Sequence, residues 1–241
     1  MIQLRPVHGL PELRPADDLA ALIAEHATLE DDDVIVVAQK VVSKAEGRIV
    51  RIDDFEPSER ARQLAGDERD PRELEVILRE AKRIVRERGP LVIAETRHGF
   101  VCASAGVDHS NTSEHGTLVL LPLDPDASAR GLRERLHDLT GRTVGVVVAD
   151  SFGRPFRHGT TDVAIGVAGF EPILDLRGTT DRIGYELRAS RVAIADEIAG
   201  AADLARGKAD GIPVVIVRGL RLRGDGAARE IVIDAELDLF R

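Results

Sequence analysis

Three short runs rich in Val and Ile most constrain how this chain can fold. They are the segments Asp33–Gln39, Thr143–Ala149 and Pro213–Gly219. β-Branched runs of this length, bounded by polar residues and Gly, are typical of buried strands. Leu91–Thr96 and Thr117–Leu123 have the same character, so the sequence predicts strands in at least five places.

Helical patterns occur between these strands. Apolar spacing and end signals predict helices over Asp17–Ala27, Asp70–Gly89, Asp126–Gly141 and Ser190–Gly207. In the second of these, Asp70 is the expected N-cap, Pro71 the first helical residue and Glu73 the partner in a capping box, with Gly89 as the stop.

The uneven alternation of strands and helices predicts a mixed α/β (α+β) fold within one domain, residues 1–241. A simple doubly wound sheet fits only the part from Thr117 to Gly219. We therefore expect two lobes, about 1–116 and 117–219, with residues 220–241 returning onto them.

Composition excludes several classes of protein. The single cysteine, Cys102, rules out an internal disulfide and a cysteine zinc cluster. No apolar stretch is long enough for a membrane span, and the first residues lack the apolar core of a secretory signal, so we expect a cytoplasmic protein without a membrane partner. A net charge of −9 with no basic stripe argues against nucleic-acid binding.

The common phosphate-binding motifs are absent from the sequence. No GxxxxGK[ST] occurs, and the nearest match, GAADLARGKA at residues 200–209, has the wrong spacing and follows a helix. No GxGxxG follows a predicted strand. Any nucleotide must therefore be bound by a less common cradle.

The segment AGVDHSN, residues 105–111, is the first candidate site. Asp108, Ser110 and Asn111 are residues that build ordinary Asx turns. They also carry the oxygen atoms that hard cations and polar ligands require. Local sequence leaves both interpretations open.

The segment ADSFGRPFRHGTTD, residues 149–162, is the stronger candidate. Asp150 follows a predicted strand, where ligands gather in open α/β sheets, and Ser151 adds a hydroxyl. Arg154 and Arg157 can each hold a phosphate or carboxylate, so we expect Asp150, Arg154 and Arg157 to contribute to catalysis. His158 is either a metal ligand or a surface hydrogen-bonding residue.

The residues after Asp150 are expected to form a loop, in which Gly153 and Gly159 allow a close backbone approach. Two of the six Phe residues of the chain, Phe152 and Phe156, lie in this stretch. They serve either as packing under the loop or as an apolar wall beside a flat ring.

Lysine is rare, and its placement is therefore informative. Two of the four lysines, Lys40 and Lys44, lie in the segment QKVVSKAEGR directly after a predicted strand. One interpretation is a solvated turn, and the other is that a lysine contacts nucleotide phosphates. The segment HGLPEL, residues 8–13, is a Gly-Pro loop with no chemistry of its own.

Taken together, the chain resembles the coenzyme F420:L-glutamate ligase family. The resemblance rests on the ordered segments GLPEL, VVSKAEGR, AGVDHSN, LLPLDPDAS, DSFGRP, TDVAIGVAG, VAIADEIAGAADLARGK and PVVIVRG. It implies GTP-dependent addition of γ-linked L-glutamate to coenzyme F420-0, and to F420-1, through an acyl phosphate. Some members carry a C-terminal nitroreductase-like domain, and this sequence is expected to represent the form without it.

The resemblance also implies a set of site residues and ligands. Nucleotide contacts are implied for Leu10, Pro11, Glu12, Leu13, Gln39, Lys44 and Asn111, and divalent-metal contacts for Asp108, Asp150 and Ser151. The implied metals are two Mg²⁺ or Mn²⁺ ions, with a monovalent cation such as K⁺, and the implied assembly is an intertwined, two-lobed homodimer. Gln39 and Ser151 depart from the usual Ser and Thr of the family, and Ser151 keeps the hydroxyl.

Two rival functions follow from the same residues. A metal-dependent phosphohydrolase built on Asp108 and Asp150 would release phosphate without glutamate. A non-catalytic nucleotide sensor would need only a metal-binding loop and a lysine.

Overall fold

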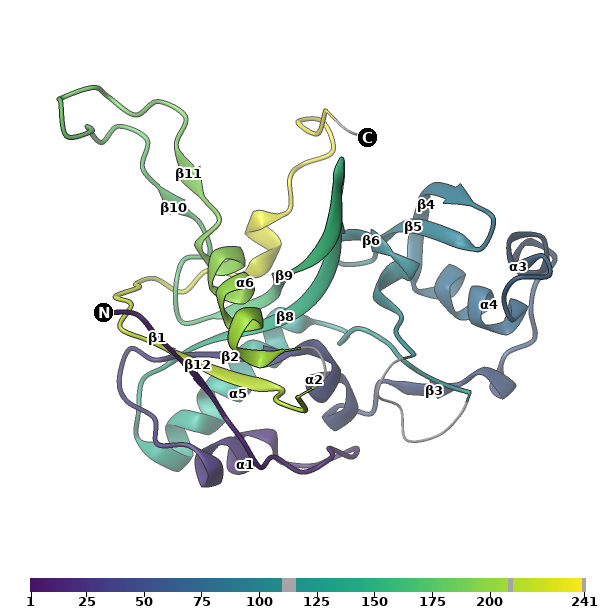
Figure 1. Ribbon diagram of the computed structural model, residues 1–241, viewed down its shortest axis with the longest axis horizontal. Helices are drawn as coiled ribbons and strands as arrows, with labels where there is room; N and C mark the ends of the chain where they lie inside the picture. Colours follow the sequence, from purple (N-terminus) through teal and green to yellow (C-terminus); the bar gives the residue numbers. More distant parts are fainter. Residues whose placement is uncertain (110–115, 208–209, 240–241) are drawn as a thin grey trace.

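The computed structural model describes residues 1–109, 116–207 and 210–239. Its centre is a five-stranded sheet with the strand order β1-β12-β2-β8-β9 (Figure 1). β2 and β8 pair in parallel, and the other neighbours pair antiparallel. The bounds of the strands are β1 Gln3–Pro6, β2 Val34–Ala38, β8 Gly145–Arg154, β9 Arg157–Ala168 and β12 Val214–Arg218. The three Val/Ile runs are thus confirmed as neighbouring central strands.

Helices cover both faces of this sheet (Figure 1). One face packs on α1 (Leu19–His26), α2 (Gln39–Ala45) and α5 (Pro125–Thr140), and the other on α6 (Ile194–Arg206). Alternate β2 residues bury into the two cores, with Ile35 and Val37 on the first face and Val34 and Val36 on the second. No helix in the described part of the chain has both the length and the apolar character that crossing a membrane requires.

A separate core lies beside the central sheet and contains α3 and α4 (Figure 1). Leu74 and Ile77 of α4 are fully buried there against Leu118. The elements of this unit are β3 Ile49–Arg51, η1 Ile52–Asp54, α3 Glu59–Ala65, α4 Pro71–Glu80, β4 Ala81–Arg88, β5 Leu91–Thr96, β6 Val101–Ala103, η2 Ser104–Gly106 and β7 Thr117–Val119. The fold is therefore mixed α and β, as the sequence predicts, while the lobe boundary near residue 116 stays a prediction.

The helix expected over Asp70–Gly89 is half right. Asp70 does cap α4, and Pro71 is its first residue, but the helix ends at Glu80. The next residues form β4, which pairs with β5 through a turn at Gly89. Glu95 of β5 binds Lys82 and Arg83 of β4 at 2.9 and 2.7 Å, so cross-strand pairing outweighs the helical propensity of this charged segment.

The loop expected after Asp150 is instead a long β-hairpin. β8 continues through Asp150 to Arg154, turns at Pro155–Phe156 and returns as β9, with Ser151 opposite Asp162 and Gly153 opposite Thr160. The β-branched residues of the segment TTDVAIGVA favour this pairing. Backbone hydrogen bonds of the hairpin therefore fix the residues after Asp150, in place of an open glycine loop.

The remaining residues extend from or fold back onto the sheet. A narrow arm carries β10 (Leu174–Asp175) and β11 (Arg191–Val192), and projects away from the body (Figure 1). The C-terminal segment returns through η3 (Ala228–Ile231), where the buried Asp126 carboxylate accepts hydrogen bonds from the backbone N–H groups of Val167 and Ala228 at 2.9 and 2.7 Å. One carboxylate therefore joins α5, β9 and the C-terminal segment.

Gly166 of β9 packs closely against Pro125, the first residue of α5, and we predict that Gly166→Ala destabilises the fold. An added Cβ would lie 2.2 Å from the Pro125 carbonyl oxygen, which is backbone and cannot rotate away. Overpacking of this kind costs about 1–3 kcal/mol. Thermal unfolding should show a midpoint several degrees below that of the wild type.

Gly153→Ala is the matched control for this prediction, because Gly153 lies on the same hairpin and an added Cβ there meets nothing within 4 Å. An equal thermal midpoint in the two variants would contradict the packing that the structure shows.

Candidate functional site

A cavity of about 590 Å³ opens at the edge of the sheet where β2 ends. Four separate parts of the chain form its walls. They are residues 10–13; residues 38–41 with Lys44; residues 149–151 with Asp162; and residues 203, 206, 207 and 211–213. Segments that are far apart in the sequence therefore meet at one cavity.

The parallel pairing of β2 and β8 explains why these segments meet. Ala38 is paired with Ala149, and beyond this pair β2 gives way to α2, while β8 continues. The first residues of α2 and Asp150 therefore lie at the same carboxyl edge, which is where ligands bind in open α/β sheets. The strand-end position predicted for Asp150 is correct relative to β2, although β8 itself extends further.

Two lysines of α2 reach the site on one helix face, because they are four residues apart. Lys40 Nζ lies 2.8 Å from the Asp108 carboxylate. Lys44 is buried and forms an ion pair with Glu12, which also lines the cavity. The solvated-turn interpretation is therefore wrong for Lys44, whose side chain is only 6% exposed.

The Asp150 carboxyl group has an unusual charge environment. Burial, with a smaller contribution from the negative charges of Asp108 and Asp162, raises its pKa to about 7 against the lowering effects of the Ser151 N–H and Lys40. Removal from water penalises an ionised carboxylate, and nearby carboxylates add repulsion. A cationic ligand at this position would relieve both effects.

Ser151 begins a chain of polar contacts on the α6 side. Its Oγ donates to Asp162 Oδ1 at 2.5 Å, and Arg206 Nη1 donates to Asp162 Oδ2 at 2.8 Å. Arg206 Nε and Nη2 are buried and have no hydrogen-bond partner among the described residues. Because unpaired buried donors are costly, the guanidinium is suited to hold an anion in the cavity.

Asp162 and Arg206 are residues that the sequence did not single out. Arg206 lies in the GAADLARGKA segment, which suggested only an imperfect P-loop. The signal that was available is the single basic residue of an Ala-rich helix, placed at its C-terminal end. The contact between Asp162 and Arg206 spans 44 positions in the sequence and could not be predicted from local pattern.

Gln39 fits the cavity wall in spite of its size. Its Nε2 donates to Ser43 Oγ at 2.6 Å and to the Leu120 carbonyl oxygen at 3.0 Å. Its buried Oε1 has no partner in the part of the chain that the structure describes. The larger side chain is therefore accommodated by hydrogen bonds, with one acceptor left for a ligand.

Other predicted residues lie outside the cavity. Arg154 and Arg157 are exposed near the hairpin turn, where Arg154 Nη2 donates to the His158 carbonyl oxygen at 3.3 Å. Their catalytic role stays a prediction. Phe156 is 90% exposed, whereas Phe152 is half-buried and packs edge to face on Phe100. Asn111 lies outside the described residues.

The side chains present fit a divalent cation that is shared with substrate. Within residues 1–109, 116–207 and 210–239, no group of three or more His, Cys, Asp or Glu side chains is arranged to hold a metal ion. Asp108 and Asp150 offer two carboxylates, and Ser151 offers a hydroxyl. Mg²⁺ characteristically takes one or two carboxylates and completes its coordination with phosphate oxygens and water.

Comparisons with known proteins place this chain among the ligases. The sequence model described as F420-0:Gamma-glutamyl ligase matches residues 9–219. The chain belongs to this family.

Curated relatives match along nearly the whole chain. A protein of Methanopyrus kandleri named coenzyme F420:L-glutamate ligase is 49% identical over 100% of this chain and 98% of its own length. Proteins of the same name from Methanothermobacter thermautotrophicus and Archaeoglobus fulgidus are each 44% identical over 100% of this chain, and over 99% and 96% of their own lengths. The family resemblance predicted from the sequence is thereby confirmed.

We predict that Asp150→Asn removes most of the affinity for Mn²⁺ and leaves the fold intact. Asn cannot supply the anionic ligand, but it also removes a buried charge that Asp108 and Asp162 repel. Titration calorimetry with Mn²⁺ measures the first effect, and thermal unfolding at pH 8 should show an unchanged or higher midpoint.

Asp203→Asn is the matched control, since Asp203 lines the same cavity but is not a predicted ligand. Unchanged Mn²⁺ affinity in Asp150→Asn would exclude the metal site.

Proposed function

We propose that this chain is a GTP-dependent ligase that adds L-glutamate to coenzyme F420-0, and to F420-1, as γ-glutamyl amides. The curated relatives are named coenzyme F420:L-glutamate ligases, which supports the acceptor and the amino acid. The observation that carries the proposal is the cavity. Most of the residues to which the family resemblance assigns nucleotide and metal contacts line that one space, and Asp108 is joined to it through its ion pair with the lining residue Lys40.

The proposed reaction has two steps. A carboxylate oxygen of the acceptor bonds to the γ-phosphorus of GTP, the bond from that phosphorus to the bridging oxygen breaks, and GDP leaves. The α-amino group of glutamate then attacks the acyl carbon of the resulting acyl phosphate and loses a proton, and inorganic phosphate leaves with one oxygen from the acceptor. The first step has a loose transition state, so positioning and charge neutralisation matter more than nucleophile strength.

The residues of the cavity are suited to these tasks. Lys44 and Arg206 line the cavity and supply positive charge, and each is paired with a carboxylate, Lys44 with Glu12 and Arg206 with Asp162. Phosphate oxygens at the cations would share or replace these carboxylates. Two Mg²⁺ or Mn²⁺ ions at Asp108, Asp150 and Ser151, with a monovalent cation such as K⁺, would neutralise the remaining phosphate charge.

The same proposal includes a two-lobed homodimer. The β10–β11 arm carries Ile183 and Tyr185, which are 84% and 73% exposed. Large apolar side chains on a projecting arm are characteristic of surfaces that contact another chain. A second copy would cover this apolar surface.

We predict that Lys44→Ala weakens GTP binding. Loss of a charge-assisted hydrogen bond to phosphate costs about 1.5–3 kcal/mol, which corresponds to roughly a 10- to 150-fold higher Kd. Lys82→Ala is the control, because Lys82 is an exposed lysine paired with Glu95 in the other core. If the two variants bind GTP as tightly as the wild type, Lys44 is not a phosphate ligand.

We predict that acceptor labelled with oxygen-18 in its carboxylate transfers one labelled oxygen to the released phosphate. The reaction contains GTP, Mn²⁺ and glutamate, and mass spectrometry of the phosphate measures the transfer. Phosphate without label would exclude the acyl phosphate, and such phosphate formed without glutamate would favour a phosphohydrolase.

A further inference from the structure

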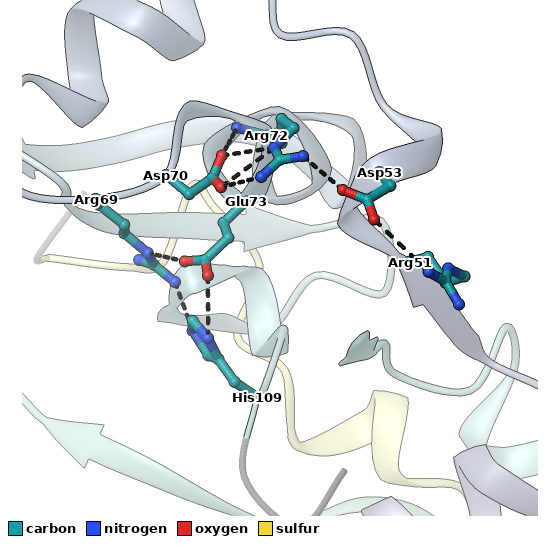
Figure 2. Close-up of polar contacts among 7 residues, drawn as sticks. All are labelled: Arg51, Asp53, Arg69, Asp70, Arg72, Glu73 and His109. Atoms are coloured by element: carbon teal, nitrogen blue, oxygen red, sulfur yellow. Dashed lines mark hydrogen bonds and ion pairs between the residues drawn. The ribbon is translucent and has the colours of Figure 1, made fainter. Parts of the chain in front are cut away.

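His109, the residue after Asp108, is held by two side chains that flank the start of α4 (Figure 2). Arg69 Nη2 lies 2.8 Å from His109 Nε2, and Glu73 Oε1 lies 3.5 Å from His109 Nδ1. Arg69 Nε also donates to Glu73 Oε2 at 2.8 Å. These three side chains form a closed ring of contacts, which we call the Arg69–Glu73–His109 clamp.

The clamp permits only one orientation of the imidazole. A guanidinium has donors and no acceptor, so His109 Nε2 must accept from Arg69. In the neutral ring the proton therefore lies on Nδ1, which faces the Glu73 carboxylate. A flipped ring would lose both contacts. The Arg69 and Glu73 side chains are only 19% and 18% exposed, while that of His109 is 46% exposed, so the two partners of the imidazole are the better shielded members of the clamp.

The helix end that carries the clamp is itself fixed. Asp70 accepts from the Arg72 backbone N–H at 2.9 Å and caps α4, with Pro71 at the first position. The Arg72 guanidinium binds the Asp70 carboxylate and also Asp53 at 2.6 Å (Figure 2). The clamp therefore joins His109 to a rigid part of the smaller core.

Asp108 is fixed from other directions as well. Its backbone exchanges two hydrogen bonds with Val119, at 3.0 and 2.8 Å. Its carboxylate lies 2.8 Å from Lys40 Nζ, on the side of the cavity. The backbone hydrogen bonds to Val119 and the clamp on the next residue therefore restrict the backbone of Asp108, so that its carboxylate can move only by side-chain rotation.

We propose that Arg69 and Glu73 are positioning residues that act through His109 to hold the Asp108 carboxylate where it can share a divalent cation with Asp150. Neither residue is among those that line the cavity, so the effect on the cation is indirect. This inference rests on the proposed function, in particular on the metal role of Asp108.

The test measures Mn²⁺ binding by titration calorimetry with the metal alone and the full-length protein. Residues that orient metal ligands typically change metal affinity by 10- to 100-fold. We expect His109→Phe and Glu73→Ala to weaken Mn²⁺ binding about tenfold. His109→Gln should retain most of the affinity, because its amide oxygen can accept from Arg69.

Glu56→Ala is the matched control, because Glu56 forms an exposed ion pair with Arg62 of α3 and is not part of the clamp. It should bind Mn²⁺ like the wild type. Circular dichroism identifies folded variants, and Glu73→Gln replaces Glu73→Ala if the latter does not fold. In ligation assays at saturating GTP, the clamp variants should need about tenfold more Mn²⁺ for half-maximal rate, with unchanged KM for acceptor.

Wild-type Mn²⁺ affinity in the folded Glu73 and His109→Phe variants would overturn the inference and leave the clamp a purely structural role. So would equal losses in His109→Gln and His109→Phe, because the hydrogen bond would then not be responsible. A wild-type protein that neither binds Mn²⁺ nor ligates glutamate would overturn the proposed function, and this inference with it.

Discussion

The parallel pairing of β2 with β8 is the constraint on which the site depends. The pairing ends at Ala38 and Ala149. After this pair, β2 is followed directly by α2, while β8 continues into the hairpin. Both strands are buried on both faces, so a shift of register would move Val and Ile side chains out of two cores at once. Core packing therefore sets where Lys40 and Asp150 meet.

Charge balance is the second organising feature of the site. Three basic side chains that line the cavity form ion pairs with carboxylates from other parts of the fold. The pairs are Lys40–Asp108, Lys44–Glu12 and Arg206–Asp162. A nucleotide and its cation bring opposite charges and can exchange partners with these pairs. Since the formal charge of the whole chain is −9, attraction of the proposed polyphosphate substrate would depend on such local cations and on the proposed metal.

The sequence predicts the fold best where local signals and tertiary packing agree. Asp124, Pro125 and the left-handed Gly141 delimit α5 almost as expected, and the β5 bounds are those predicted. The helix predicted beyond Glu80 is wrong because the partner that makes these residues a strand, β5, is a tertiary contact. The loop predicted after Asp150 is wrong for a similar reason, since its glycines favour a loop locally while pairing with β9 makes a hairpin.

The sequence indicates which residues share the candidate cavity better than it indicates their geometry, and the roles of these residues stay predictions. The family resemblance gathers Leu10–Leu13, Gln39, Lys44, Asp150 and Ser151, all of which line one cavity. Local pattern could not give the Asp162–Arg206 pair or the clamp on His109, because both depend on contacts about forty residues apart. The catalytic role predicted for Arg154 and Arg157 rests on their chemistry alone. Both lie at the turn of the hairpin and are not among the residues that line the cavity.

The central claim is that this cavity couples GTP cleavage to amide formation. The most direct measurement is phosphate release from GTP with Mn²⁺, in the presence and absence of coenzyme F420-0 and L-glutamate. The account predicts sustained phosphate release only when both substrates are present, with one phosphate released for each γ-glutamyl bond formed. Equal release from GTP alone would contradict it.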